Sequence, residues 1–494
     1  MRKTFKKVIS ILLCLTLVLS MGMFSASASE EGTAVERVSC VVNGDTATQR
    51  GFAWYTEAET GTEIKIFKNG LTDVTSQLTL SDVRCEEWEG HYMHKVTVSG
   101  LQAGTFYTYV VGNGSEWSTP GRFTTDGKDD AVSFITIADV QASSAENFEK
   151  ASFVVDAAMK KMPNADFIAN LGDITNDSTN EEWDYYYEYF QKQQLSTTFV
   201  PVAGNHDGLG VWHWFDNMYN LDTSESVQTL NGVNYSYDYG NAHFAVLNTN
   251  DLLAISNAQL DWLKNDMNST DADWKIVFMH KSPYTLGKDG KWPDALYLAD
   301  SLAAVLDECD VDVVMSGHDH QYLRTKPLYD NAVAEDGNGT TYILAGTAGT
   351  KRYEVREFMP GVYMEKDFID AMTIQKNGYG NYWDGEDWDQ TDPANVGGVF
   401  STIKIDGGEL KFEAYVVNDE TLDLKLIDEM TLTKETGMGE ATFEGDNTTS
   451  ELDYYLGVIP SFINLAGFTL GEWLIKTLLN LPKILYYVIK TDTF

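Results

Sequence analysis

The chain has 494 residues, enough for roughly two to four domains, and its 43% hydrophobic, 12% aromatic and 22% charged residues are typical of a globular protein. Its 74 acidic residues outnumber the 35 basic ones and give a net charge of −39, so we expect no nucleic-acid partner. Small phosphate esters are not excluded, because bound cations can reverse the local field.

Residues 1–28 have the three parts of a secretory signal peptide. Four basic residues come first, an apolar run extends from Val8 to Leu19, and the small residues 26–28 form a cleavage site. We therefore expect the mature chain to be secreted or extracellular. It would be associated with the cell surface if its C-terminal tail binds a membrane.

Residues 29–127 are expected to form an all-β sandwich that serves as an accessory module. Short runs rich in β-branched and aromatic residues alternate with turn sequences such as Asn43-Gly44-Asp45. The segment 101–110, with its alternating tyrosines, resembles a late strand of fibronectin type III domains. The expected strands are 38–42, 51–55, 63–68, 94–99, 105–111 and 121–125.

Three cysteines follow the signal peptide, too few for a disulfide scaffold. Cys40 and Cys85 would either pair within the β-sandwich or remain free, and the sequence leaves both open. Cys309 precedes an apolar strand and is expected to be an inert core thiol. We expect His91 and His94 to lie on the surface of the β-sandwich.

Residues 128–435 alternate apolar strands with helices, which predicts a layered α/β domain whose strands are buried on both faces. Strand signals return at 398–434, around the turn Asp406-Gly407-Gly408. The expected strands before them are 132–138, 167–171, 198–203, 243–248, 276–279, 311–316 and 342–345. The expected helices are 146–162, 181–194, 258–266 and 295–307.

Residues 436–494 are expected to be a linker and an apolar helical tail. The segment 454–471 has no charged residue, but Pro460 and three glycines interrupt it, which makes it a poor membrane-spanning helix. Two alternatives remain open for the tail: a helix packed on the protein, or a helix in contact with a membrane surface.

Five short motifs stand where predicted strands end. They are Ala138-Asp139-Val140-Gln141, Leu171-Gly172-Asp173, Gly204-Asn205-His206-Asp207, Phe278-Met279-His280 and Gly317-His318-Asp319-His320. Because ligands of α/β domains gather at the carboxyl ends of strands, we expect these side chains to converge. Four of the eight histidines lie in the motifs, whereas His243 lies inside a strand and is expected to be structural.

The ligand types in these motifs predict a metal site. Carboxylate, amide and imidazole groups without a thiolate cluster suit divalent Mn, Fe, Zn or Co and argue against a structural zinc site. The simplest arrangement has two ions bridged by Asp173, because a shared anion offsets the repulsion between two cations. Asn205, His280 and His318 would complete one ion, and Asp139 and His320 would hold the other.

The five motifs in this order resemble those of calcineurin-like metallophosphoesterases, in particular the purple acid phosphatase branch, over about residues 35–435. The resemblance implies a layered α/β/β/α catalytic domain behind the fibronectin type III-like sandwich. It implies hydrolysis of a small phosphate monoester by hydroxide formed from water at two divalent ions. It also places His206 over the leaving group as a general acid or a transition-state stabiliser, oriented by Asp207.

Two positions depart from the family pattern. Asn176 stands where purple acid phosphatases have the tyrosine that gives their colour, and Gln141 stands where other branches have a histidine. We therefore expect a colourless enzyme with a weaker first metal site. Each of these two residues would either ligate a metal or face the pocket.

The substrate pocket cannot be derived from the sequence. The aromatic segment 211–215 would either line it or form a packed loop, and the cations near motif ends that could bind phosphate are Lys281, Arg324, Lys351 and Arg352. Two other functions remain open: a phosphodiesterase acting on nucleotides or cell-surface polymers, and a surface-binding protein with an inactive metal site.

Overall fold

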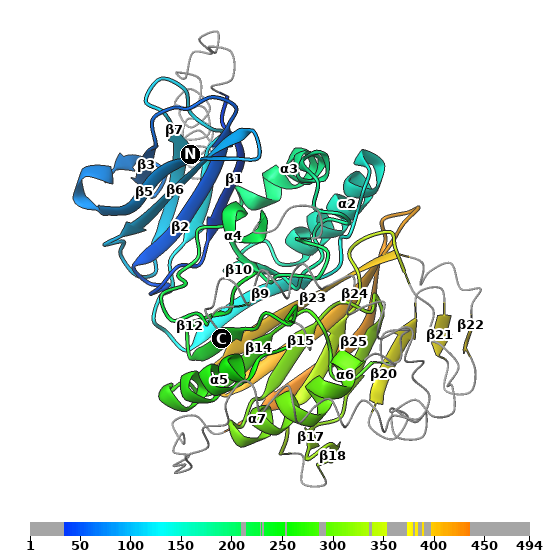
Figure 1. Ribbon diagram of the computed structural model, residues 1–494. Coiled ribbons are helices and arrows are strands. Elements are labelled where there is room, and N and C mark those ends of the chain that lie inside the picture. Colours follow the sequence, from blue (N-terminus) through cyan, green and yellow to red (C-terminus); the bar gives the residue numbers. More distant parts are fainter. Residues whose placement is uncertain are drawn as a thin grey trace, which may run out of the picture.

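The computed structural model describes most of the chain between residues 34 and 434 (Figure 1). The described ranges are 34–208, 214–227, 229, 232–251, 254–285, 293–334, 338–352, 373–378, 381–383, 388–389 and 397–434. The signal peptide expected at 1–28, the linker and tail expected at 436–494, and residues 211–213 of the aromatic segment lie outside the described residues.

The N-terminal region is the expected β-sandwich. A four-stranded sheet in the order β4-β3-β7-β8 packs against β1, β2, β6 and β5, with Phe52, Trp54 and Tyr109 buried between them. The strands are β1 (Glu36–Val41), β2 (Gln49–Thr56), β3 (Glu63–Lys68), β4 (Thr72–Asp73), β5 (Thr79–Trp88), β6 (His91–Ser99), β7 (Phe106–Gly112) and β8 (Gly121–Thr124), with a 3-10 turn at Thr75–Gln77. The sequence did not predict β5, because this edge strand is mostly exposed and lacks an apolar face.

The sandwich is continuous with the next domain. Strand β1 pairs in parallel with β11 at Val41 and Phe199, which produces one ten-stranded sheet in the order β25-β24-β23-β9-β10-β11-β1-β2-β6-β5. Buried Arg37 of β1 also binds Asp184 of the neighbouring helix at 2.6 Å. The added strands are β9 (Ala131–Ile137), β10 (Phe167–Asn170), β11 (Thr198–Pro201), β23 (Gly397–Asp406), β24 (Glu409–Asn418) and β25 (Leu424–Thr433). The accessory module is therefore fixed to the layered α/β body.

A second sheet, of nine strands, packs face to face with the β9–β11 and β23 part of the first. Its order is β12-β13-β14-β15-β19-β16-β20-β21-β22, and β13, β14, β15 and β19 run in parallel. The strands are β12 (Tyr235–Tyr239), β13 (Ala242–Val246), β14 (Trp274–Phe278), β15 (Val313–Ser316), β16 (Tyr322–Thr325), β19 (Thr341–Ala345), β20 (Thr373–Gly378), β21 (Asn381–Trp383) and β22 (Trp388–Asp389); the ribbon β17 (Leu328–Tyr329) and β18 (Ala332–Val333) lies apart from it. Stacked aromatic rings, among them Phe134 and Phe167 at 4.9 Å, form the core between the sheets.

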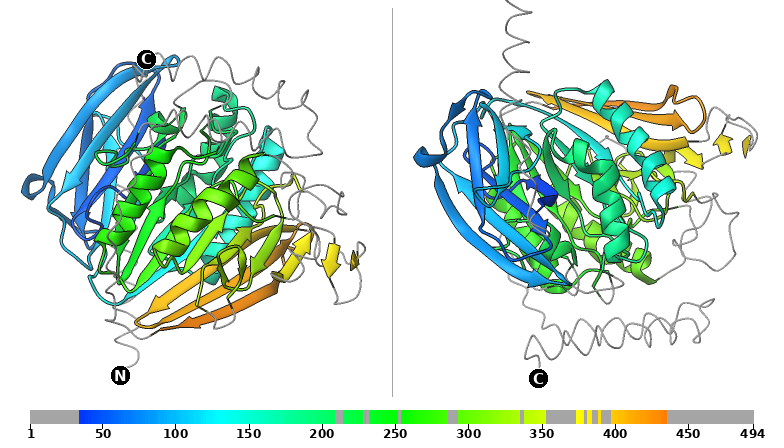
Figure 2. Two further views of the ribbon diagram at one scale, coloured as in Figure 1. Left: turned by 60° about the horizontal axis from the view of Figure 1, so that its bottom comes forward. Right: turned by 90° about the horizontal axis from the view of Figure 1, so that it is seen from above.

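Helices cover the outer face of each sheet and complete the α/β/β/α layers (Figure 2). Helices α2 (Ala145–Lys161) and α3 (Asn180–Gln194) lie on the first sheet, and α3 begins with a capping box between Thr179 and Glu182. The other helical segments are α4 (Trp214–Met218), α5 (Asn257–Ser269), α6 (Pro293–Tyr297), a π-helical segment (Leu298–Leu302) and α7 (Ala303–Glu308). Among the described helices, none is long and apolar enough to cross a membrane.

The cysteine and histidine expectations for the sandwich have mixed outcomes. Cys40 and Cys85 are both free, because β2 and β6 lie between their strands and separate them by roughly 14 Å at the usual strand spacing. The surface position expected for His94 is wrong: its side chain is fully buried and stacks on Trp54 of the adjacent strand at 5.1 Å. Cys309 is buried, as expected, at the end of α7.

Candidate metal centre

Five loops meet where the carboxyl ends of the two sheets adjoin. They follow β9, β10 and β11 in the first sheet and β14 and β15 in the second, and each carries one of the five sequence motifs. The strand–loop alternation therefore brings together side chains that are up to 181 positions apart in the sequence. The six expected ligands are Asp139, Asp173, Asn205, His280, His318 and His320.

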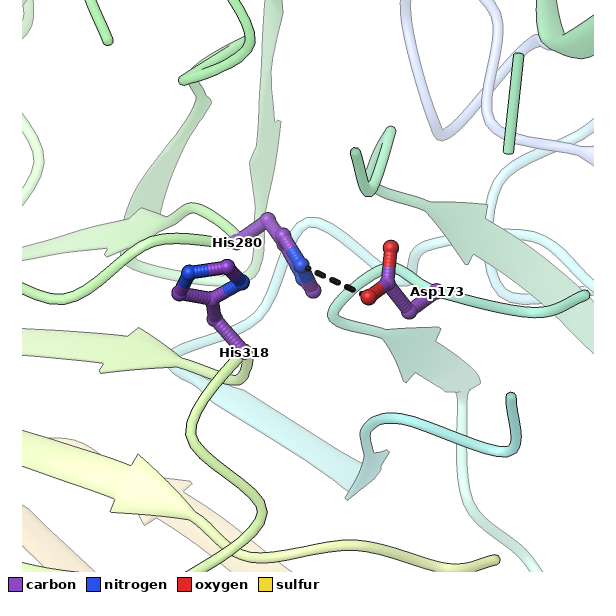
Figure 3. A group of neighbouring side chains, drawn as sticks. All are labelled: Asp173, His280 and His318. Carbon is purple, nitrogen blue, oxygen red and sulfur yellow. Dashed lines mark ion pairs between the residues drawn. The ribbon is translucent and has the colours of Figure 1, made fainter. Parts of the chain in front are cut away.

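Two groups of candidate ligands overlap at this point. The ligand atoms of Asp173, His280 and His318 lie within 4.8 Å of one another, and so do those of Asp139, Asp173 and His320. Figure 3 shows the first group, with the His280 ring between the Asp173 carboxylate and the His318 ring. Asn205 Oδ1 lies 3.2 Å from His280 Nε2 and therefore belongs to the same group. Asp173 is common to both groups, the position that the sequence assigned to the bridging ligand.

Backbone carbonyl groups orient two of the imidazole rings in these groups. His280 Nδ1 lies 2.9 Å from the Leu171 carbonyl oxygen, and His320 Nδ1 bonds the Lys351 carbonyl oxygen. A carbonyl oxygen only accepts, so Nδ1 donates to it, and Nε2 is the nitrogen that can bind a cation when the ring is neutral. In both rings Nε2 faces a carboxylate, at 3.2 Å for His280 and Asp173 and at 3.5 Å for His320 and Asp139.

Close backbone approach positions the two aspartates. Both Asp139 carboxylate oxygens accept from the His318 amide, at 3.0 and 2.9 Å, and Asp173 Oδ1 accepts from the His206 amide at 2.8 Å. The glycines of two motifs make room for them. A Cβ atom at Gly204 would lie 2.2 Å from Asp173 Oδ1, and one at Gly317 would lie 2.5 Å from Asp139 Oδ2.

The electrostatics of the pocket favour a bound cation. Burial raises the pKa of Asp139 well above its ordinary value, and the charge of Asp173 adds to the effect. Burial also raises the pKa of Asp173, but the adjacent His280 lowers it more, so Asp173 stays ionised. Burial lowers the pKa of His320 to about 3, which keeps the ring neutral. Within the described ranges no Lys or Arg side chain binds either carboxylate, so the residues present fit divalent cations as the missing positive charge.

The structure changes the expected role of Asp207. Its Oδ1 accepts from the amides of Ile174 and Thr175 at 2.7 and 3.2 Å, and its Oδ2 accepts from the Gly204 amide at 2.8 Å. The expectation that Asp207 orients the His206 ring is wrong, because both of its oxygens are used by the backbone. His206 Nδ1 instead lies 2.5 Å from the backbone carbonyl oxygen of Asn176.

The two residues that depart from the family pattern lie in different environments. Gln141 is 5% exposed, and its backbone N–H donates to the Asp173 carbonyl oxygen at 2.8 Å. Its side-chain Oε1 has no hydrogen-bond partner among the described residues. Asn176 is half-buried and contributes its backbone carbonyl to His206. The structure therefore brings Gln141 into the interior of the loop cluster and leaves the Asn176 side chain partly open to solvent.

Three of the four candidate phosphate-binding cations have carboxylate partners. Arg324 makes two hydrogen bonds to Asp428, at 2.6 and 2.8 Å, and Arg352 makes two to Asp419 at the same distances. Lys281, directly after His280, binds Asp294 at 2.9 Å. Lys281 and His318 also line a cavity of about 10 Å³, which has room for about one water molecule. Lys351 contacts the site through its backbone carbonyl oxygen, which bonds His320 Nδ1.

Sequence reasoning missed the carbonyl groups of Leu171, Asn176 and Lys351. Every residue has a carbonyl, so residue type gives no signal for such a partner. The first two lie in or beside the second motif, and that position alone could have suggested them. Of the aromatic segment 211–215, the structure describes the side chain of Phe215 alone, and this ring is fully buried in the core beneath α3.

Comparisons with known proteins agree with this geometry. Residues 132–322 match the calcineurin-like phosphoesterase family, and residues 35–125 match the purple acid phosphatase N-terminal domain. Probable inactive purple acid phosphatase 1 of Arabidopsis thaliana is 24% identical over 62% of this chain and 57% of that protein. Purple acid phosphatase 22 of the same plant is 25% identical over 52% and 59%. The chain thus spans less than two thirds of the length of these relatives.

Solved structures show the same fold. Purple acid phosphatase PPD1 from yellow lupin (Lupinus luteus) seeds has a TM-score of 0.61 at 15% identity and covers 82% of this chain and 75% of that chain. PhoD has a TM-score of 0.55 at 10% identity and covers 89% and 99%. Both family matches fall on the regions where the structure has the sandwich and the layered body. The chain therefore combines a purple acid phosphatase N-terminal domain with a calcineurin-like metallophosphoesterase domain.

Proposed function

We propose that this protein is a secreted, metal-dependent phosphomonoesterase with a centre of two divalent ions. The observation that carries the proposal is the pair of ligand groups that share Asp173. A structural cluster has no need of two overlapping sets of buried carboxylate and imidazole donors, whereas a two-ion centre requires a shared anion. The signal sequence at 1–28 supports secretion.

The ligands divide between the ions as the sequence suggested. Asp173, Asn205, His280 and His318 would hold one ion, and Asp139, Asp173 and His320 would hold the other. When bound, the ions would activate a water molecule and neutralise charge on the phosphoryl oxygens. Their identity is proposed as Mn, Fe, Zn or Co, because the donors are oxygen and imidazole nitrogen.

His206 would donate a proton to the leaving oxygen of the substrate. Its Nδ1 is fixed on the Asn176 carbonyl, so Nε2 is the nitrogen that can exchange a proton with another group. The His206 side chain is half-buried, unlike the fully buried His280, and so remains accessible to a substrate. Asp207 would act indirectly, by holding the loops that carry Asp173 and His206.

A monoester is the proposed substrate class because of the similarity to purple acid phosphatases. Lys281 lies beside His318 but is paired with Asp294, so its charge does not by itself select a monoester. The acidic surface elsewhere favours small substrates over nucleic acids. Contact of the 436–494 tail with a membrane surface remains a proposal of the same kind.

Metal removal and a pair of substrates test this function. The purified protein is treated with a chelator and assayed on p-nitrophenyl phosphate and bis-p-nitrophenyl phosphate before and after Mn²⁺ is restored. We expect activity to disappear and return, with the monoester hydrolysed faster. A faster reaction with the diester would identify a phosphodiesterase. Metal binding without hydrolysis of either ester would identify the surface-binding alternative.

The presence of Asn176, where purple acid phosphatases have a tyrosine, predicts the colour of the protein. Without a phenolate ligand, we expect the iron-loaded protein to lack the purple charge-transfer band. Visible absorption of the iron-loaded sample checks this expectation, and a strong band near that of tyrosinate–iron complexes would contradict it.

A further inference from the structure

We propose that Gln141 Oε1 is a ligand of the ion held by Asp139, Asp173 and His320. The inference rests on the proposed function and assigns a donor to the ion that has fewer ligands in the arrangement above. It concerns this chain's own departure from the family pattern, since the histidine that other branches have at this position is absent.

The backbone places Gln141 between the loops that carry the two aspartates. The backbone N–H of Asp139 donates to the Gly172 carbonyl oxygen at 3.0 Å, and the backbone N–H of Gln141 donates to the Asp173 carbonyl oxygen at 2.8 Å. These two hydrogen bonds hold residues 139–141 alongside residues 172–173. The Gln141 side chain therefore starts from the same pair of loops as both carboxylates of this ion.

The side-chain amide oxygen of Gln141 is buried and lacks a protein partner. The residue is 5% exposed, and Oε1 makes no hydrogen bond to a described residue. Two other buried glutamines also have an unpartnered Oε1, but their side-chain nitrogens are bonded, Gln193 to Asp156 and Gln194 to Tyr186. A buried amide oxygen without a partner is unfavourable. A cation at Oε1 would compensate, because an amide oxygen is a suitable neutral ligand for these ions.

The backbone conformation links Gln141 to the ligand residues. Its φ is +34°, and the φ values of Asp139, Asp173, His318 and His320 are +50°, +52°, +78° and +49°. Positive φ is unfavourable for residues with a side chain and is frequent at functional sites as well as in turns. Gln141 therefore shares an unfavourable backbone conformation with four of the candidate ligands around it.

Asn176, the other departure from the pattern, is the weaker candidate for this ligand. Its side chain is half-buried, so water can solvate its amide, and its backbone carbonyl is occupied by His206 Nδ1. A move of this segment toward the ion would disturb the ring that we assign to proton transfer. The geometry thus favours Gln141 as the additional oxygen donor.

Metal titration of a nearly isosteric variant tests the proposal. Gln141→Met keeps the side-chain volume and removes the amide oxygen, and Gln141→His supplies the imidazole of other branches. Co²⁺ is titrated into metal-free protein and followed by calorimetry and by visible absorption. We expect two binding events in the unchanged protein. Gln141→Met should weaken one of them about 10–100-fold and change its absorption spectrum. Gln141→His should restore the affinity but with a spectrum of its own, because a nitrogen donor replaces the oxygen donor.

Gln194→Met is the matched control, because Gln194 is also a buried glutamine with an unpartnered Oε1 but lies at the end of α3. It should keep both binding events whatever its effect on unfolding temperature. If Gln141→Met binds two ions with unchanged affinity and spectrum, Gln141 is not a ligand while the proposed function stands. If the unchanged protein binds no Co²⁺, both proposals fail. Should Gln141→Met not fold, equal affinities of Gln141→His and the unchanged protein with identical spectra would overturn the assignment.

Discussion

Two buried clusters of histidine and aspartate lie at opposite ends of the second sheet, and they differ in which atoms remain unpaired. At the start of β13, His243 is held between Asp238 and Asp266, with Nδ1 and Nε2 at 2.7 and 2.8 Å from carboxylate oxygens. At the carboxyl ends of β14 and β15, the candidate ligand histidines face buried carboxylates that have no Lys or Arg partner among the described residues.

The two clusters differ in the groups that the two nitrogens of each imidazole ring contact. Both nitrogens of His243 bond carboxylates, and Asp238 is 69% exposed, so a protonated ring is neutralised by the protein and by water. His280 and His320 each use one nitrogen on a backbone carbonyl and keep the other for a ligand. The first arrangement is complete without an ion, whereas the second places buried imidazole nitrogens and carboxylates where they could bind one. This contrast distinguishes the two histidine clusters of this protein.

The largest expected effect is that of Asp173→Asn, which removes the charge shared by both ligand groups. We expect bound metal to fall below one ion per chain and activity to drop by more than about 10²-fold, beyond the effect usual for residues that only support a ligand. Elemental analysis and p-nitrophenyl phosphate hydrolysis measure the two effects. The matched variant Asp238→Asn, in the His243 cluster, should retain metal and activity. Equal metal loss in both variants would remove the distinction between the clusters.

His206→Ala is expected to have the next largest effect, on turnover alone. Both metals should remain bound, and kcat should fall about 10²-fold because the leaving oxygen loses its proton donor. The loss should be greater for an alkyl phosphate than for p-nitrophenyl phosphate, whose leaving group needs less protonation. Undiminished turnover, or an equal loss for both leaving groups, would show that His206 is not a general acid.

The smallest effect concerns stability at the His243 cluster. Burial lowers the pKa of His243, but hydrogen bonds from Asp238 and Asp266 raise it more, to about 9. Since the folded pKa lies above the unfolded one of about 6.5, the cluster stabilises fully below pH 6.5, and the contribution is lost as pH rises through 9. After allowance for the exposed Asp238, it amounts to about 2 kcal/mol.

His243→Gln measures this contribution. Its free energy of unfolding should be lower than that of the unchanged protein at pH 6 and nearly equal to it at pH 10, with metal content unchanged at both. Urea unfolding at a series of pH values gives the curve, and His91→Gln, at the half-buried start of β6, is the control. A difference that grows toward high pH would mean that His243 is neutral in the folded protein.

Much of the catalytic body could be predicted from the chain alone. Apolar runs bounded by turns marked the strands of the first sheet except β5 and the parallel strands β13, β14, β15 and β19 of the second, whereas β12, β16 and β20–β22 were not predicted. The motif residues followed the ends of the predicted strands. Those local signals were enough to predict that Asp139, Asp173 and His280 converge, and to single out Asp173, which the structure places in both candidate ligand groups. Signals failed where a strand had no apolar face, as in β5, or where a polar residue occupied a core position, as His94 does beside Trp54.

The sequence by itself determined which candidate ligands this protein has and in what order they occur, because residue type and strand position can be recognised from the local sequence. The tertiary structure alone decided how those ligands are held. The His280 ring is fixed by a carbonyl 109 residues away, Asp207 holds backbone amides instead of the His206 ring, and β1 joins the sandwich to the catalytic sheet. Backbone groups carry no residue identity, so pairings made through them over long sequence separations appear only once the chain has folded.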